Sequence, residues 1–197
     1  MVDAVRARKD SRLYDPATMV TSERELLERA QCGDLDAFAE FVRTFERRIR
    51  SVLYRLLEDA RDVDEAVQDT FVQAWRNLGR FRGDAAPYTW LYRIAVNEAL
   101  QRGRRKTVPT SELQDTTVSA GEDAYAAADA REFLIERLRA LPIEYRAAVV
   151  LRDVEGLSNE EVARVLEISL AAAKSRIHRG RMQLREELER RERESGG

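Results

Sequence analysis

The sequence contains one cysteine and one histidine, Cys32 and His178, among its 197 residues. A lone cysteine excludes an intrachain disulfide, and the two residues together cannot supply the four ligands of a usual Cys/His zinc site. His178 lies within the basic run 174–179, which we interpret as a solvated helical face rather than the wall of a catalytic pocket. We therefore expect no metal, no cofactor and no Ser–His–Asp chemistry.

Glycine, proline and long apolar runs are also scarce. The sequence has 9 Gly and 4 Pro without a glycine-rich phosphate loop, so nucleotide hydrolysis is not indicated. No apolar run approaches the roughly 20 residues that span a bilayer, and the amino terminus lacks the apolar core of a signal peptide. With 34 basic and 36 acidic residues in near balance, we expect a globular, cytoplasmic protein that is not an enzyme and does not insert into membranes.

Helix signals recur along the chain, and no stretch shows the polar–apolar alternation of a strand. Segments 22–25, 62–65 and 158–161 have the pattern of capping boxes, in which side chains satisfy free backbone N–H groups at a helix start. Pro87 and Pro142 suit first helical turns, and Gly33, Gly79 and Gly156 suit helix ends. The fold is predicted to be all-α, with helices over 22–32, 34–56, 62–79, 87–106, 130–140, 142–156, 158–166 and 170–191.

Composition divides the chain into two small helical domains. Segment 107–129 holds five acidic residues and no Lys or Arg, which is typical of a flexible, acidic linker. The first domain, 22–106, then contains four helices, and the second, 130–191, contains the rest. Residues 1–21 and 192–197 are predicted to be terminal tails.

The third predicted helix has an unusual outward face. Its core stripe is complete without Val72 and Trp75, which fall on the opposite side among polar residues at helical spacing. An aromatic and an aliphatic side chain on a polar face suggest a surface for docking another protein. The alternative, that Trp75 packs back onto the first or second helix, is equally compatible with the periodicity. The outward set is Glu65, Gln68, Asp69, Val72 and Trp75.

The fourth predicted helix places an aromatic, arginines and amides on one stripe. This combination offers a ring for stacking, charges for phosphates and donors for base edges, as unstacked single-stranded DNA requires. The alternative is a core tryptophan beside a row of surface arginines. The stripe consists of Trp90, Arg93, Asn97, Gln101 and Arg104.

The last helix follows a short capped helix and a three-residue turn, 167–169, which together describe a helix-turn-helix. Its predicted core stripe is Leu170, Ala173, Ile177, Leu184 and Leu188. Small and basic residues lie on the other faces, where they would let the backbone approach a major groove and attract phosphates.

Two blocks of the sequence closely resemble a known family. Segments 62–71, 80–84 and 89–97, together with Trp75, resemble region 2 of bacterial extracytoplasmic-function (group 4) sigma factors of the sigma-70 family. Segments 141–142, 145–146, 151–158 and 174–176 resemble their region 4. The resemblance implies a factor that joins the RNA polymerase core and directs it to promoters, with an anti-sigma factor as its regulator.

The resemblance also assigns roles to residues. Region 2 would bind the β′ clamp of the polymerase through Glu65, Gln68, Asp69, Val72 and Trp75. It would open and hold the −10 element through Arg80, Phe81, Arg82, Tyr88, Trp90, Arg93, Asn97, Gln101 and Arg104. Region 4 would contact the β flap and read the −35 element through Ser169, Ala172, Lys174, Ser175, Arg176, His178 and Arg179.

Some positions depart from the family pattern. Glu167 stands where the helix-turn-helix commonly has glycine, and a left-handed backbone there would cost about 1 kcal/mol. Ala171, Ala172 and Ala173 replace a helix start that usually includes a hydroxyl residue.

The alternative function is a regulator that binds DNA through the helix-turn-helix without the polymerase core.

Overall fold

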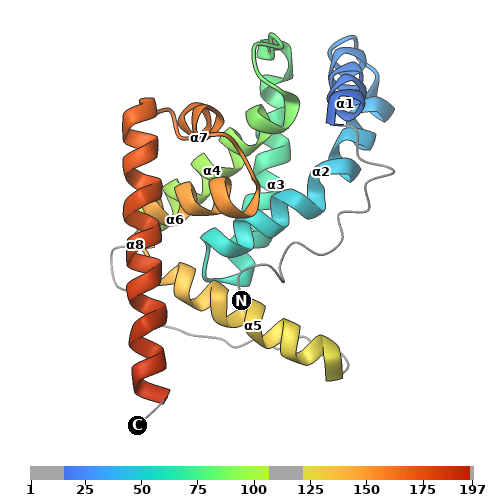
Figure 1. Cartoon of the computed structure of the whole chain (residues 1–197). Coiled ribbons are helices and arrows are strands. Elements are labelled where there is room, and N and C mark those ends of the chain that lie inside the picture. The colour runs from blue at the N-terminus through green and yellow to red at the C-terminus, as the bar shows by residue number, and fades with distance from the viewer. Residues whose placement is uncertain (1–15, 107–121, 196–197) are drawn as a thin grey trace.

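The computed structural model describes residues 16–106 and 122–195, and these contain helices and no strand (Figure 1). The predicted all-α fold is therefore confirmed. The N-terminal bundle comprises α1 (Pro16–Gln31), α2 (Leu35–Leu56), α3 (Ala60–Asn77) and α4 (Pro87–Lys106), with a 3₁₀ turn, η2 (Leu78–Arg80). The C-terminal bundle comprises α5 (Glu122–Arg139), α6 (Ile143–Val149), a π-helical turn, η3 (Val150–Val154), α7 (Asn159–Val165) and α8 (Leu170–Ser195).

Several helix ends follow the local signals. Asp34 caps α2 by accepting a hydrogen bond from the Ala37 amide at 3.0 Å. Ser158 and Glu161 form the predicted capping box of α7. Gly156 takes a positive φ of 76°, which glycine adopts without steric cost.

Two predicted helix starts are wrong. α1 begins at Pro16, whose missing N–H suits a first helical turn, so Ser22 lies inside the helix. α3 begins at Ala60, because Asp59 accepts a hydrogen bond from the Arg61 amide at 2.8 Å and caps the helix before segment 62–65.

The predicted linker and tails are also shorter than expected where the structure describes them. α5 begins at Glu122 inside the predicted linker, because segment 124–130 is rich in alanine, the strongest helix former. α8 continues through its Glu- and Arg-rich end to Ser195. Residues 1–15, 107–121 and 196–197 lie outside the described residues.

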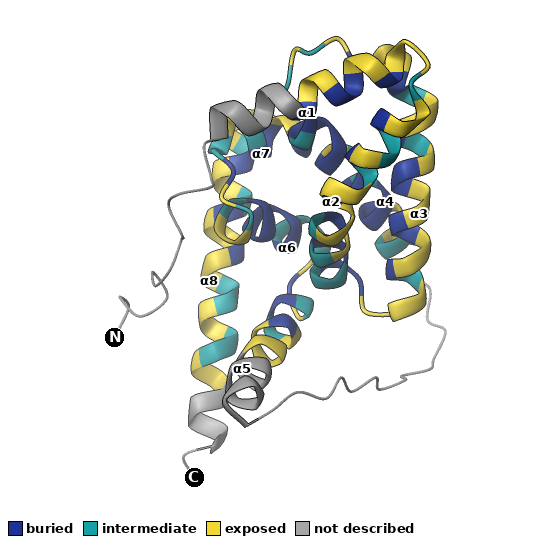
Figure 2. Ribbon diagram, turned by 90° about the vertical axis from the view of Figure 1, so that its right-hand side faces the viewer, coloured by how far each residue is buried: buried dark blue, intermediate teal, exposed yellow. Residues whose placement is uncertain are grey.

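α4 is the central helix of the molecule. It packs against α1, α2 and α3 of its own bundle and against α6 and α7 of the other. The fully buried side chains include Phe41, Phe45 and Ile49 of α2 and Leu91 and Tyr92 of α4. Buried residues of both bundles form one continuous apolar cluster (Figure 2). The two bundles therefore share a core along α4.

Candidate functional site

The outward face of α3 is exposed as the helical period predicts. Val72 and Trp75 are 45% and 41% exposed, although both are large apolar side chains. The Trp75 ring also lies 4.9 Å, centroid to centroid, from the ring of Phe38 on α2. Trp75 therefore packs on α2, as the alternative interpretation expected, and still presents apolar surface to solvent; a docking role for that surface stays a prediction. The polar residues predicted for the same face, Glu65, Gln68 and Asp69, are exposed as well.

Asp69 connects this face to α4. Its carboxylate pairs with the guanidinium of Arg102, which also pairs with Glu98 on its own helix. Burial of Arg102 opposes its charge, but the hydrogen bonds that it donates to the Asp69 and Glu98 carboxylates outweigh that cost and raise its pKa. Gln73 of α3 donates to the Glu98 carboxylate and extends the network. α3 and α4 are therefore joined by charge as well as by apolar packing.

The predicted stripe on α4 is only partly exposed. Arg93, Gln101 and Arg104 face solvent and Asn97 is half-buried. Trp90 is 7% exposed, because the ring of Phe81 from the preceding loop lies against it at a centroid distance of 5.2 Å. Trp90 is therefore a core residue beside the exposed arginines Arg93 and Arg104, as the alternative interpretation of this helix expected.

A cavity of about 270 Å³ opens between the 80–85 loop and the start of α4. Its aromatic wall is formed by Phe81 and Trp90, and its rim carries four arginines: Arg80, Arg82, Arg93 and Arg164. Helix α1 holds the loop in place, because the Gln31 side chain donates to the Leu78 and Phe81 carbonyls, each at 2.8 Å. The cavity thus has a base of largely buried aromatic side chains and a lining with four arginines and one acidic residue, Asp84, a net positive charge that suits a phosphate backbone.

Arg164 is a cavity residue that sequence reasoning missed. It belongs to α7, the first helix of the helix-turn-helix, and reaches the cavity because α7 packs on α4. Its position in the sequence resembles that of any solvated charge on a short helix. No local signal in the sequence could have placed it there.

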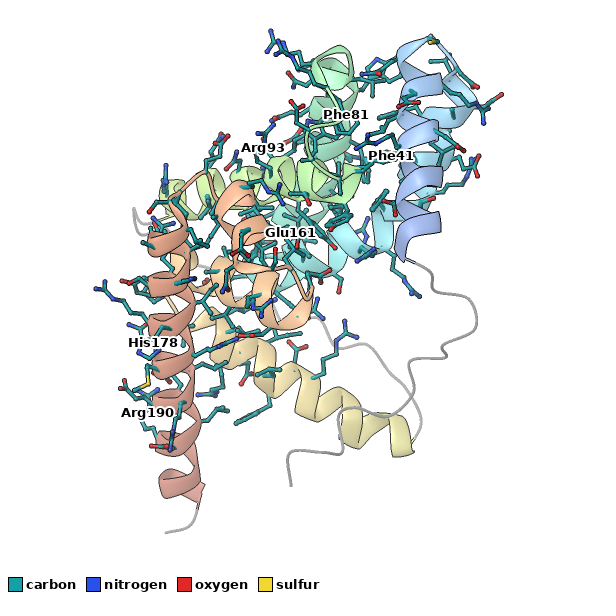
Figure 3. All side chains as sticks on the ribbon, turned by 45° about the horizontal axis from the view of Figure 1, so that its top comes forward. Phe41, Phe81, Arg93, Glu161, His178 and Arg190 are labelled. Atoms are coloured by element: carbon teal, nitrogen blue, oxygen red, sulfur yellow. The ribbon has the colours of Figure 1, made fainter. Side chains whose placement is uncertain are left out.

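The exposed face of α8 carries the predicted basic residues. Lys174, Ser175, His178 and Arg179 are exposed, while Ala172 and Arg176 are half-buried (Figure 3 labels His178). Among the described residues, Lys174 and Arg176 form no ion pair, so their charges are available to a ligand. The Ser169 hydroxyl accepts a hydrogen bond from the Ala172 amide at 3.2 Å at the helix start.

The opposite face of α8 packs inward at Ala173 and Ile177, which are 0% and 4% exposed. Leu170, predicted for the core stripe, is instead 38% exposed. It is the first residue of the helix, where the chain has only just left the turn and the core does not yet reach it. Leu184 is partly buried against the core, and Leu188 is half-buried without belonging to the buried cluster, so the predicted stripe is buried only in the first half of the helix.

The turn between α7 and α8 has a strained residue. Glu167 has φ of 53°, and it is the only non-glycine residue with a positive φ among those described. Its carboxylate lies 3.7 Å from the Arg93 guanidinium of α4. The left-handed conformation considered for this position is therefore present, and its side chain reaches the N-terminal bundle.

The described residues contain no group of three or more His, Cys, Asp or Glu side chains placed to hold a metal. None of their helices combines the length and apolar character needed to cross a membrane. Cys32, at the end of α1, is exposed.

Comparison with known proteins agrees with these features. Residues 41–108, which span most of α2 to α4, match the family described as Sigma-70 region 2, and residues 132–184 match Sigma-70, region 4. RNA polymerase sigma-H factor of Pseudomonas aeruginosa is 36% identical over 179 residues, covering 83% of this chain and 93% of the relative. The ECF RNA polymerase sigma-E factor of Escherichia coli K12 is 34% identical over 176 residues, covering 81% and 91%.

The chain belongs to the extracytoplasmic-function group of the sigma-70 family. Members of this family are RNA polymerase sigma factors that act in transcription initiation, a regulatory rather than a catalytic role. In this sigma factor the exposed face of α3 lies in region 2 and the basic face of α8 lies in region 4, while the cavity beside α4 is lined by region 2 residues together with Arg164 of region 4.

Solved structures agree at the level of the whole chain. CnrH in complex with the cytosolic domain of CnrY has a TM-score of 0.66 and 29% identity, covering 85% of this sigma factor and 97% of that chain. The sigma factor RpoE with the anti-sigma factor NepR from Bartonella quintana has a TM-score of 0.63 at 23% identity, covering 79% and 98%. The second likeness concerns the fold alone.

Proposed function

We propose that this sigma factor binds the polymerase core through the outward face of α3 and carries it to promoters with two separate DNA-binding surfaces. The observation that carries this proposal is the exposed Val72 and Trp75 pair on an otherwise polar helix. Apolar and aromatic side chains surrounded by polar ones are typical of a protein-binding hot spot. The resemblance to region 2 supports the β′ clamp as the partner.

The two DNA surfaces differ in character. The cavity beside α4 offers aromatic walls and arginines, which favours an unstacked strand of the −10 element. The amino-terminal half of α8 presents small and basic residues in a helix-turn-helix, which favours the major groove of the −35 element. Together they would fix the polymerase on two parts of one promoter, with region 4 also contacting the β flap.

An anti-sigma factor is the regulator we propose. The solved structures of RpoE with the anti-sigma factor NepR and of CnrH with the cytosolic domain of CnrY each contain a second protein on a chain of similar fold. Partners and polymerase would meet this sigma factor in the cytoplasm, where transcription takes place.

The test measures affinity for purified core polymerase by titration of a fluorescently labelled sigma factor. Replacing both Val72 and Trp75 with alanine is expected to weaken binding at least tenfold, because a buried aromatic anchor commonly contributes about 2 kcal/mol or more. These positions are preferred to Asp69, whose loss would also break the Arg102 pair. Arg61→Ala, an exposed change at the other end of α3, is the matched control.

Transcription from a pool of genomic fragments with the same core then separates the two candidate functions. Promoter-specific starts that depend on this protein support a sigma factor. Sequence-specific DNA binding without core, together with no gain in initiation when core is present, would instead support the free-standing regulator. Unchanged core affinity in the double variant would overturn the assignment of the α3 face.

A further inference from the structure

Two polar side chains of α1 hydrogen-bond the backbone that leads into the 80–85 loop. The Gln31 amide donates to the Leu78 and Phe81 carbonyls. The Arg24 guanidinium donates to the Gly83 carbonyl at 2.7 Å. Arg24 and Gln31 lie close to two helical turns apart, so both project from one face of α1. That face contacts the turn between α3 and α4 at one end of the N-terminal bundle (Figure 1). Three carbonyls of this short segment therefore accept hydrogen bonds from a single neighbouring helix.

The shape of the loop matches these donors. Gly83 has φ of 76°, in the left-handed region that favours glycine, and a Cβ there would lie 3.4 Å from Nη1 of Arg24. The guanidinium thus packs directly over the glycine whose carbonyl it holds. The hydrogen bond from Gln31 fixes the backbone of Phe81, whose ring lies 5.2 Å from the ring of Trp90. α1 therefore sets where the loop and its aromatic side chain stand.

A different set of side chains holds α1 itself to the bundle. Leu26, Leu27 and Ala30 are buried and belong to the continuous apolar cluster. Arg24 and Gln31, in contrast, are exposed residues whose polar groups reach sideways to the loop. Apolar contacts are the main source of helix stability in a folded protein. Removing the two polar groups should therefore release the loop and leave the packing of α1 in place.

We propose that Gln31 and Arg24 are positioning residues for promoter opening, because they hold the 80–85 loop in the shape that receives an unstacked −10 strand. This inference rests on the proposed role of the loop and α4 in −10 binding. The two residues act through the loop carbonyls and not through contact with DNA. A loop that is ordered before DNA arrives does not have to be ordered during binding, and affinity falls with the fraction of molecules in the competent shape. α1 thus controls the opening step, whereas core binding is proposed for α3.

The test uses holoenzyme assembled from core polymerase and the full-length sigma factor, on a promoter identified by initiation from genomic fragments. Gln31→Leu keeps a similar side-chain size and removes both donors. Arg24→Leu removes the donor to Gly83 and is the second variant. Glu25→Leu is the matched control, because Glu25 is exposed on the same helix and points about 100° away from Arg24 around the helix axis.

Two quantities are measured for each variant. Fluorescence anisotropy of a labelled promoter at low temperature gives the affinity of the initial, still double-stranded complex. The fluorescence of 2-aminopurine placed in the −10 element gives the rate of strand opening. Gln31→Leu is expected to slow opening about five- to thirtyfold, equivalent to 1–2 kcal/mol, because two hydrogen bonds to the loop are lost. Affinity in the initial complex should be unchanged, since that complex does not use the loop. Arg24→Leu should slow opening by a smaller factor, because its single hydrogen bond is exposed.

Hydrogen–deuterium exchange of the free sigma factor reports on the loop directly. In the Gln31→Leu variant, the amides of residues 78–86 should exchange faster than in the parent, because the carbonyls that anchor this segment have lost their donor. The buried amides of α2 and α4 should keep their exchange rates. The Glu25→Leu control should match the parent in exchange, in initial binding and in opening.

An opening rate equal to that of the control would overturn the inference. So would an initial affinity that falls as much as the opening rate, because that pattern indicates a general loss of structure. Slow opening with unchanged exchange of residues 78–86 would also overturn it, since the effect would not pass through the loop. Failure of the proposed function looks different, because holoenzyme with the parent sigma factor would then open no promoter. If the parent and Gln31→Leu open the promoter equally fast, only the positioning role is refuted.

Discussion

Replacing Arg146 with methionine is expected to lower the free energy of unfolding by about 3 kcal/mol. Arg146 is 5% exposed and lies where the two bundles meet. Its guanidinium donates to the Leu56 carbonyl at the end of α2, at 2.8 Å, and to the Leu141 carbonyl at 3.0 Å. It also donates to the Arg139 carbonyl at the end of α5. Methionine keeps a similar volume and supplies no donor.

The magnitude follows from opposing contributions. Hydrogen bonds from a charged donor contribute about 1.5–3 kcal/mol each, and a buried carbonyl left without a donor costs about 1–3 kcal/mol. Burial works against the charge and lowers the pKa of Arg146, with Glu58 at 3.7 Å as partial compensation. Methionine removes the cost of burying the charge, which is several kcal/mol per ion. This gain offsets much of the stability lost when three carbonyl acceptors are left without their donor. Lysine keeps the charge but lacks the planar guanidinium that donates in several directions. Arg146→Lys should therefore retain only part of the stability that Arg146→Met loses.

The assay is urea unfolding followed by circular dichroism and by tryptophan fluorescence. Both tryptophans, Trp75 and Trp90, belong to the N-terminal bundle, whereas circular dichroism reports both bundles. In the Arg146→Met variant we expect both signals to shift to lower urea together, because the two bundles share a core along α4. Arg185→Met, at a side chain that is 74% exposed, is the control and should cost under about 0.5 kcal/mol. A methionine variant within 1 kcal/mol of the parent, which is well below the estimate, would refute the reasoning.

Three further predictions concern other parts of the molecule. Gly180→Ala should lower the free energy of unfolding by roughly 1–2 kcal/mol despite the better helix propensity of alanine, because the new Cβ would lie 2.6 Å from Val149 Cγ2. An unchanged Tm would contradict this. Lys174→Ala and Arg179→Ala should each reduce the salt slope of promoter binding by about 1, and an identical slope would remove that residue from the phosphate contacts. Burial raises the pKa of Glu23 above its ordinary value of 4.5, and the positive charge of Arg48 offsets only part of this effect. The free energy of unfolding should therefore rise as the pH falls toward 4.5. Glu23→Gln should flatten this dependence and be more stable at neutral pH, as urea titrations at several pH values would show.

The helices themselves were largely predictable because their signals are local. The exposed Val72 and Trp75 and the basic face of α8 follow from a period of 3.6 residues, which needs no knowledge of the rest of the chain. The capping box at Ser158 is likewise visible within a few residues, whereas the left-handed backbone at Glu167 was considered only because the resembled family commonly has glycine there. The starts of α1 and α3 were misplaced, because stronger start signals precede the capping patterns that were recognised.

What could not be predicted depends on how the bundles pack. Trp90 is buried because a loop side chain covers it, which periodicity along α4 does not reveal. Arg164 and Glu167 reach α4 from more than sixty residues away in the sequence. The buried position of Arg146 arises from carbonyls at the ends of two other helices. Each of these features requires the tertiary arrangement.

The shared guanidinium of Arg102 has a consequence for communication within the molecule. Asp69 stands on the face proposed for polymerase, while Arg102 stands on the helix that carries the DNA surface. A partner that draws the Asp69 carboxylate toward itself leaves Arg102 to Glu98 alone. Binding of a partner to the α3 face would thereby change the charge around α4, because both helices share the Arg102 side chain.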